Sequence, residues 1–391
     1  MKILYIFTSP SIKGSSVQTK VLNQIKYLNK AGADCRGAFF STEVNEVTPL
    51  NEYVDFVPVR ESNWKYFKAI GQLKILNKTM SEFISQRFDK TDIFYLRYPG
   101  ASKGLFKISK KFGAKIVSEH QSKEIDEIKS HENQNQFGLR PSKLMSWYLY
   151  TFLPIYNENK WGSSFAKHIN SIVTVTNEIA RYQSKKGCKN VIVSTNGIDV
   201  SSFILKEIIK PKEPLTLLFL KGTTSIAEWN GINRLIEGID KLETPEKKIK
   251  LVICGHYING EIPHRNYIEH KGYLNKEELN GLFNEVDLGI STLALHKKNL
   301  NEASVLKSRE YVARGLPFIY AYIDPDLNDE AKAFSLEFPN DDSAIDMQKV
   351  IDFAKKIALD TDHPQKMRKY AEEHLDYEVK MKRLLLELNK L

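Results

Sequence analysis

Two glutamates in the last quarter of the chain, Glu302 and Glu310, have a residue type and spacing that suit hydrogen bonding to a ligand. Seven residues separate them, and Gly315 and Pro317 follow closely. Glycine tolerates the positive φ at a helix C-terminus, and proline beyond it stops the helix, so Glu310 is expected inside a short helix and Glu302 in the preceding loop. A carboxylate there can accept two hydrogen bonds from a vicinal diol such as a ribose. The alternative is a surface helix with merely solvated carboxylates.

The start of the same predicted helix is a candidate phosphate site. Backbone N–H groups in the first turn of a helix lack partners within the helix, and they favour an anion. Here these groups belong to Ser304, Val305 and Leu306. Phosphate at the N-terminus and a diol on Glu310 would together fit one nucleotide.

The stretch resembles the nucleotide-sugar motif of the family 4 retaining glycosyltransferases, which have the GT-B fold. The matching residues are Glu302, Glu310, Ala313, Gly315, Leu316 and Pro317. The resemblance implies two Rossmann-like, doubly wound parallel-sheet domains that face a central cleft. It also implies that Glu310 binds the donor ribose, that no metal is required, and that the glycan belongs to capsule, exopolysaccharide or cell-envelope synthesis. We predict His120 and Glu302 as the catalytic residues.

Strand-like apolar runs alternate with helical patterns along the whole chain, as in α/β proteins with parallel sheets. At 391 residues the chain favours two domains. We predict an N-terminal acceptor domain at 1–203, a proline-punctuated linker at 204–214 and a C-terminal donor domain at 215–370. The last helix of GT-B proteins returns to the first domain, so 371–391 is assigned there. Strands are expected at 2–7, 54–59, 93–96, 116–119 and 172–175, and then in the runs LTLLFL, KIKLVIC, YIEHKG, DLGIS and PFIYAY.

The N-terminal domain offers two features at the carboxyl ends of predicted strands, where open α/β sheets bind ligands. The small residues Gly14, Ser15 and Ser16 follow the first strand and would let an acceptor or diphosphate approach the backbone; an ordinary turn explains them equally well. His120 ends another strand, and family members carry a histidine near the donor sugar at this place. A lone histidine is otherwise most often structural. At the end of this domain, Asn196-Gly197 predicts a turn with positive φ.

The sequence departs from the resembled family where the donor diphosphate is neutralised. Relatives place an arginine and then a lysine before the glycine equivalent to Gly231, whereas this chain has Thr224 and Asn230. Lys221, Lys307 or Arg309 must then supply the positive charge. Lys307 is the strongest candidate because it lies between the two glutamates, close to the predicted helix N-terminus.

Two stretches of the N-terminal half suggest contact with a membrane. Residues 64–88 carry apolar side chains at helical spacing, together with Lys65, Lys68, Lys74 and Lys78. Residues 147–161 contain Trp147, Tyr148, Tyr150, Phe152, Tyr156 and Trp161. Aromatic and basic residues suit the anionic inner leaflet, and we expect reversible peripheral binding there; burial of the aromatics within the domain is the alternative.

The amino-acid composition limits the classes of partner that the protein is expected to bind. The net charge of +9 favours an anionic partner, but no nucleic-acid-binding pattern accompanies the scattered lysines, so nucleic acid is not expected. Three distant cysteines and the lack of a long apolar run indicate a cytoplasmic protein. Asp360-Thr361-Asp362 follows a helical run and is predicted to be a polar turn. No metal site and no cofactor are therefore expected, and any Mg²⁺ would come with the substrate diphosphate.

We expect transfer of a hexose, with retention, from a nucleoside-diphosphate sugar to a hydroxyl of a saccharide or a polyprenyl-diphosphate-linked acceptor. Two alternatives remain. One is a nucleotide-sugar epimerase or hydrolase on the same fold, and the other is a non-catalytic scaffold that binds the sugar nucleotide.

Overall fold

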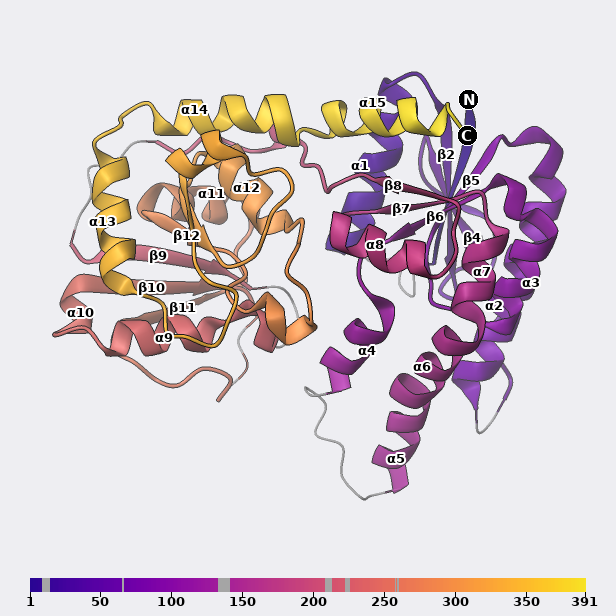
Figure 1. Ribbon diagram of the computed structural model, residues 1–391, viewed down its shortest axis with the longest axis horizontal. Helices are drawn as coiled ribbons and strands as arrows, with labels where there is room; N and C mark the ends of the chain where they lie inside the picture. The colour runs from indigo at the N-terminus through magenta and orange to yellow at the C-terminus, as the bar shows by residue number, and fades with distance from the viewer. Residues whose placement is uncertain are drawn as a thin grey trace. The chain divides into compact units, whose positions relative to one another are not determined.

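The computed structural model describes residues 1–8, 15–64, 67–132, 141–207, 213–221, 226–256, 258 and 260–391. The chain forms two compact units (Figure 1). Unit 1 comprises Met1–Thr195 and Lys380–Leu391, and unit 2 comprises Asn196–Val379. The division lies a few residues before the boundary near 203 that the sequence suggested. The chain rejoins unit 1 at Lys380, so 371–379 belong to unit 2.

Unit 1 is built on an eight-stranded sheet with the order β3-β4-β2-β1-β5-β6-β7-β8. All neighbouring strands are parallel except β3 and β4. The order reverses direction beside β1, which pairs with both β2 and β5. The strands are β1 (Lys2–Thr8), β2 (Asp34–Ser41), β3 (Thr48–Asn51), β4 (Val54–Pro58), β5 (Ile93–Arg97), β6 (Ile116–His120), β7 (Ser171–Thr174) and β8 (Asn190–Val193).

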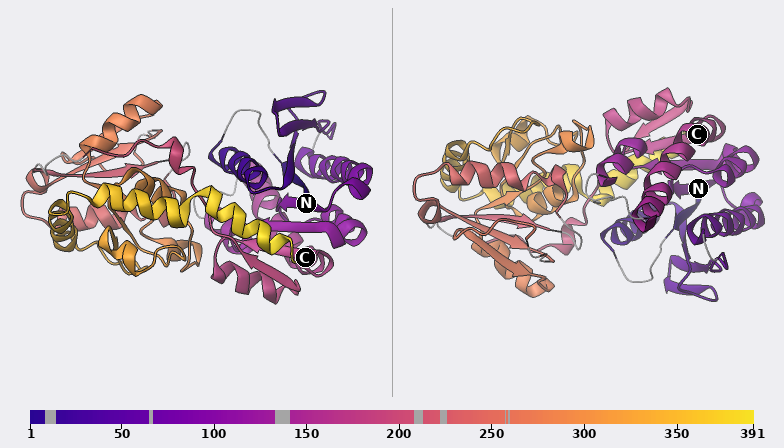
Figure 2. Two further views of the ribbon diagram at one scale, coloured as in Figure 1. Left: turned by 90° about the horizontal axis from the view of Figure 1, so that it is seen from above. Right: turned by 90° about the horizontal axis from the view of Figure 1, so that it is seen from below.

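Helices cover both faces of this sheet (Figures 1 and 2). Ile6 and Phe94 pack in one cluster with residues of three helices, including Met80, Leu105 and Phe165. A π-helical turn, Tyr148–Phe152, joins α5 to α6, and a second, Glu158–Gly162, joins α6 to α7. The helices are α1 (Ser16–Lys30), α2 (Lys68–Arg87), α3 (Lys103–Phe112), α4 (Glu124–Glu132), α5 (Pro141–Trp147), α6 (Leu153–Asn157), α7 (Ser163–His168) and α8 (Asn177–Lys185).

Unit 2 has a six-stranded sheet, fully parallel, with the order β11-β10-β9-β12-β13-β14. Its order reverses direction at β9, which pairs with β10 on one side and β12 on the other. The strands are β9 (Leu215–Leu220), β10 (Ile249–Cys254), β11 (Ile268–Gly272), β12 (Leu288–Ile290), β13 (Phe318–Tyr320) and β14 (Ser335–Glu337). The helices are α9 (Ile232–Asp240), α10 (Pro245–Lys248), α11 (Lys276–Glu285), α12 (Leu306–Arg314), α13 (Met347–Ala358), α14 (His363–Tyr370) and α15 (Tyr377–Leu388), which continues into unit 1.

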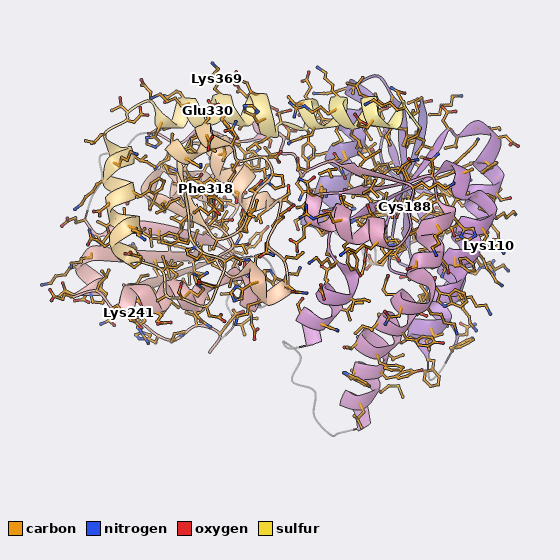
Figure 3. The ribbon with its side chains drawn as sticks, viewed as in Figure 1. Lys110, Cys188, Lys241, Phe318, Glu330 and Lys369 are labelled. Carbon is orange, nitrogen blue, oxygen red and sulfur yellow. The ribbon has the colours of Figure 1, made fainter. Side chains whose placement is uncertain are left out.

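Alternation along the strands of unit 2 distributes side chains to two separate cores, because successive strand residues point to opposite faces. Leu218 and Phe318 pack with residues of α11 and α12. Leu217 and Phe219 pack on the other face with residues of α9 and α13. Figure 3 labels Phe318 in the interior of the unit. Both faces are therefore covered, as the doubly wound prediction requires, and the predicted fold class is confirmed.

Two parts of unit 1 differ from the expectation. The strands β2 and β3 were not expected, and β3 adds an antiparallel edge to the otherwise parallel sheet. The helical pattern expected over 64–88 begins only at Lys68 as α2. Within the described residues, no helix is both long and apolar enough to cross a membrane.

Candidate functional site

The topology of unit 2 brings the predicted donor residues to one edge of its sheet. In open α/β sheets a ligand-binding crevice forms at the carboxyl ends of the strands, where the strand order reverses. In unit 2 this place is the carboxyl end of β9 and β12. Lys221 directly follows β9, and the chain after β12 leads to Glu302 and then to α12. The loops from these two strands meet, since Leu293 N–H donates to the carbonyl of Asn230 over 3.1 Å.

The helix predicted around Glu310 is present as α12, and its ends are those the sequence requires. Gly315 closes it with φ of +72°, in the left-handed region that favours glycine. At the other end, Val305 is the N-cap residue, and neither it nor another side chain of the described residues forms a capping hydrogen bond with the first turn. The hydroxyl of Ser304 instead accepts a hydrogen bond of 2.8 Å from the N–H of Asn196. The first-turn N–H groups are thus left without a capping side chain, as a phosphate site requires.

Glu310 lies in the middle of α12 and is half-buried, with one oxygen held in place. Its Oε1 accepts a hydrogen bond of 2.9 Å from Nε of Arg314, one turn further along the helix. Arg314 itself donates to Oδ1 of Asn280 over 2.7 Å. Arg314 therefore orients the carboxylate, and lone pairs remain on the glutamate for a diol.

Glu302 lies where the backbone forms a short bridge to the segment after β13. The flanking residues make the bridge, because Ala303 N–H donates to the carbonyl of Ile323 over 3.0 Å and Ile323 N–H donates to Asn301 over 2.8 Å. The half-buried Glu302 is thereby fixed through its main chain. Its position is set by tertiary pairing and not by a helix.

Lys307 has surroundings that suit a phosphate ligand. Its Nζ donates to Oδ1 of Asn230 over 3.2 Å and lies 4.4 Å from the centre of the Phe219 ring. No carboxylate contributes to its titration, and burial lowers the pKa of Lys307 to about 7. The side chain nevertheless keeps some exposed surface. Lys307 therefore places an amine beside Asn230, the position at which the resembled family carries its lysine.

Arg309 has a different role from the one that the sequence suggested. Its side chain is 0% exposed, and its guanidinium pairs with Asp324 and Asp326. Burial alone would lower the pKa of Arg309, but these carboxylates raise it overall. A guanidinium enclosed in this way cannot reach a ligand. The assignment of Arg309 to the donor diphosphate is therefore wrong. Arg309 instead connects α12 to the segment after β13 through these ion pairs.

Lys221 is also engaged within the protein. Its Nζ forms an ion pair with Glu261, and the same carboxylate accepts a hydrogen bond from the N–H of Ile226. Glu261 therefore links Lys221, directly after β9, to Ile226. Of the three cations proposed for the diphosphate, only Lys307 has no ion pair among the described residues. Thr224 lies outside those residues.

Asn196 is a residue of the site whose role the sequence did not reveal. Residues 194–197 form no turn, and neither Asn196 nor Gly197 has positive φ, so the predicted turn is not formed. Asn196 instead bonds to Ser304 with both its backbone and its side-chain amide, and its carbonyl accepts from Nε of Arg309 over 3.4 Å. The Asn-Gly signal could have drawn attention to this position, although not to its partner.

In unit 1, His120 ends β6 as predicted, but its ring is enclosed. The side chain is 3% exposed, its Nδ1 bonds to Glu124, and its Nε2 lies 3.1 Å from the hydroxyl of Ser118. Tyr98 stacks on the ring at 4.1 Å. Burial alone would raise the pKa of Glu124, but His120 and Lys186 lower it to about 2. Glu124 therefore accepts from Nδ1–H, which fixes the tautomer and the orientation of the imidazole.

The small-residue loop of unit 1 can be placed only in part. Ser15 caps α1, because its hydroxyl accepts a hydrogen bond of 3.1 Å from the N–H of Gln18. Ser16 is the exposed first residue of that helix. Gly14 lies outside the described residues. Across the part of the chain that the structure describes, no group of three or more metal-ligating side chains gathers.

Comparison of the structure with solved structures identifies the fold. No protein-family model matches the chain, and no curated protein sequence matches it. Sucrose-phosphate synthase from Thermosynechococcus elongatus is similar in structure with a TM-score of 0.66, at 11% identity over 99% of this chain and 98% of that chain. The lipopolysaccharide outer core galactosyltransferase WaaB, in its apo form, has a TM-score of 0.62 at 12% identity, over all of both chains. Anabaena HepE in complex with UDP-glucose has a TM-score of 0.58 at 12% identity, over 99% of this chain and 100% of that chain. The chain thus has the fold of the GT-B glycosyltransferases.

Proposed function

We propose that this protein is a glycosyltransferase that takes a hexose from a nucleoside-diphosphate sugar. One observation carries the proposal: Lys307 places its amine beside Asn230 at the uncapped start of α12. Together they form a half-buried site for a diphosphate, at the sheet edge where an α/β fold binds ligands. Several structural neighbours hold UDP or UDP-glucose, which supports a nucleotide donor.

The residues of unit 2 suggest how the leaving group is stabilised. The N–H groups of the first turn of α12 and the Lys307 ammonium would receive the charge that develops on the diphosphate. Glu310, oriented by Arg314, would accept both hydroxyls of the ribose. Glu302, fixed by the bridge to Ile323, is proposed to orient the sugar. We propose retention and independence from metal on the resemblance to family 4, in which the diphosphate oxygen takes the proton of the incoming hydroxyl.

His120 is proposed to act on the reacting sugar from unit 1, with Glu124 as its positioning residue. The Nδ1–H bond to Glu124 leaves Nε2 as the atom that can exchange its contact with Ser118 for one with a substrate hydroxyl. Unlike Arg309, His120 is among the residues that line a cavity of unit 1, and a ligand in that cavity would meet its ring. The tautomer fixed by Glu124 would orient Nε2 for this contact. The donor nucleotide would bind without it.

We propose a lipid-linked or free saccharide as the acceptor, in capsule, exopolysaccharide or cell-envelope synthesis on the inner face of the membrane. Aromatic side chains just before α2 and along the π-helical turn and α6 support contact with a bilayer, because six of them are exposed: Trp64, Phe67, Tyr148, Tyr150, Phe152 and Tyr156. Sedimentation with anionic liposomes tests this part. Binding should fall with salt and after changing Lys65, Lys68, Lys74 and Lys78 to Gln. Binding that changes with neither the lipid charge, nor the salt concentration, nor these substitutions would refute membrane contact.

A transfer assay tests the proposed activity. The protein is incubated with a panel of nucleotide sugars and short-chain lipid-linked acceptors, and product and free nucleoside diphosphate are both measured. Equal amounts of product and diphosphate support transfer, and the anomeric configuration of the product tests retention. Diphosphate without product indicates a hydrolase. A nucleotide sugar that stays bound without being turned over indicates a non-catalytic scaffold. The scaffold is the second candidate function because the diphosphate site differs from that of the resembled family.

A further inference from the structure

Unit 1 contains a large cavity that the donor site does not use. It measures about 1190 Å³, and only residues of unit 1 line it. It opens at the carboxyl ends of β5 and β6, beside the point where the strand order of this sheet reverses. Its walls come from α2, α3, α4 and the helical run through Leu153 and Glu158. This is the place where an open α/β sheet binds a ligand.

The cavity is preformed, because buried hydrogen bonds fix its walls. Glu158, on the helical run after α6, accepts a hydrogen bond of 2.7 Å from the N–H of Ala101 and one of 3.0 Å from the Tyr98 hydroxyl. Gly104 allows α3 to approach α2 closely, since a Cβ at this position would lie 2.6 Å from Cβ of Asn77. Asn77 in turn donates to the hydroxyl of Ser102 over 3.2 Å.

The buried carboxylates in the floor of the cavity are neutralised within the protein. Glu119 pairs with Lys20 at 3.2 Å, and burial alone would raise the pKa of Glu119 although Lys20 and Arg97 lower it to about 2. Lys186 pairs with Glu124 at 2.7 Å and with Glu158 at 3.4 Å. These three carboxylates therefore each have a lysine partner within the protein.

Two lysines at the mouth, Lys103 and Lys107, are not neutralised in this way. Lys103, Lys107 and Lys111 follow one another at intervals of four, so they share one face of α3. All three line the cavity and are exposed. Lys103 and Lys107 form no ion pair with any residue that the structure describes. From α2, Lys74 lies over the Trp64 ring at 4.5 Å, and Lys78 is 3.9 Å from Glu82.

Part of the lining is apolar. Leu149, Leu153 and Pro154 line the cavity from the π-helical turn and α6, and Leu73 and Ile70 contribute from α2. A ligand that fills the cavity must satisfy unpaired cations at the mouth and an apolar surface beside them. A neutral sugar satisfies neither requirement, and an inorganic anion satisfies only the first.

We infer that this cavity binds an amphiphile whose phosphate or diphosphate lies on Lys103 and Lys107 and whose hydrocarbon chain lies along Leu149 and Leu153. The inference rests on the proposed function for its biological meaning, since such a ligand would be the lipid-linked acceptor. Ammonium groups are common phosphate ligands, and several of them on one face suit a diphosphate.

Calorimetry with dodecyl phosphate, below its micellar concentration, tests the inference on the full-length protein. Dodecyl maltoside and glucose 1-phosphate serve as the neutral amphiphile and the phosphate without a chain. Dodecyl phosphate should bind at least tenfold more tightly than either. The variant K103Q/K107Q should weaken its binding at least tenfold, and higher salt should weaken it further.

Matched variants distinguish binding in the cavity from a general effect of positive charge on the surface of unit 1. K90Q/K110Q removes two exposed lysines of unit 1 that do not line the cavity, of which Lys110 is labelled on α3 in Figure 3. It should change the affinity less than twofold. Leu153→Gln should weaken dodecyl phosphate and leave glucose 1-phosphate unchanged. Equal loss in both lysine pairs, or glucose 1-phosphate binding as tightly as dodecyl phosphate, would overturn the inference.

The result is independent of the donor site, because the same protein is titrated separately with nucleotide sugars. Binding of dodecyl phosphate without binding of any nucleotide sugar would support the cavity and refute the proposed function. Transfer activity without binding of dodecyl phosphate would support the proposed function and overturn the inference about the cavity.

Discussion

Replacing Lys307 by Met should remove the diphosphate contribution to donor binding and leave the nucleoside contribution intact. Methionine keeps the length of the apolar stem over the Phe219 ring and removes only the amine. UDP serves as the probe because structural neighbours were solved with it. A charge-assisted hydrogen bond to a phosphate contributes about 1.5–3 kcal/mol, so UDP should bind the variant about 10–150-fold more weakly at pH 7. Uridine should bind as it does to the wild type, because it carries no phosphate.

The pH dependence gives a sharper test of the same lysine. Burial lowers the pKa of Lys307 to about 7, and a bound diphosphate would raise it again. Binding should therefore take up a proton, and affinity should be highest below pH 7 and fall as the pH rises. If only the protonated lysine binds, the Kd for UDP should increase about 50-fold between pH 7 and pH 9. The nucleotide itself is about 90% ionised at pH 7 and more so at higher pH, since its last phosphate pKa is about 6, so its own titration changes the affinity little in this window.

Isothermal titration calorimetry of UDP and uridine from pH 7 to pH 9 measures both effects. Lys307→Met should bind UDP with a flat pH profile. The control Lys241→Met alters an exposed lysine that pairs with Glu237 on α9, and it should behave as the wild type. A flat profile in the wild type, or an equal loss of UDP and uridine affinity in Lys307→Met, would refute the assignment of the amine to the diphosphate.

Three further substitutions test the remaining assignments. Glu310→Ala should weaken UDP and uridine alike by about 1–3 kcal/mol, because two hydrogen bonds to a neutral diol are lost; unchanged affinity in calorimetry would remove Glu310 from the ribose. Arg309→Met should destabilise unit 2 by about 3–5 kcal/mol in denaturant unfolding, since it leaves Asp324 buried without its partner; full stability with lost UDP affinity would restore Arg309 as a ligand. His120→Ala should lower kcat about 100-fold with UDP affinity unchanged, and normal turnover would make His120 purely structural.

Local signals in the sequence were sufficient to predict α12. Gly315 and Pro317 determine where this helix ends, and both act through their own backbone, so no tertiary information is needed. The same holds for strands such as β9 and β10, whose apolar runs are interrupted only by Thr216 and Lys250 because both faces of the sheet are covered. The alternation of such strands with helices predicts a doubly wound α/β fold, whereas GT-B was implied by the resemblance around Glu302 and Glu310 and is supported by the solved structures.

Other features depend on contacts between distant residues and could not be predicted. The pattern of β2 is interrupted by Arg36 and Gly37, yet Gly37 is needed because a Cβ there would lie 2.7 Å from Cγ2 of Val54. Arg309 was mistaken for a ligand because its partners, Asp324 and Asp326, follow the next strand and meet it only in the folded unit. Glu124 meets His120 because the chain turns between the end of β6 and the start of α4, and no helical spacing in the sequence indicates this contact.

Native mass spectrometry with an equimolar mixture of nucleotide sugars tests the central claim most directly. The wild-type protein should retain one nucleoside-diphosphate sugar, or a small set that shares one base. A double variant, K307M/E310A, should lose it, while K241M should keep it. Retention of no nucleotide sugar by the wild type, or equal retention by the double variant, would contradict a donor site built on Lys307, Glu310 and the start of α12.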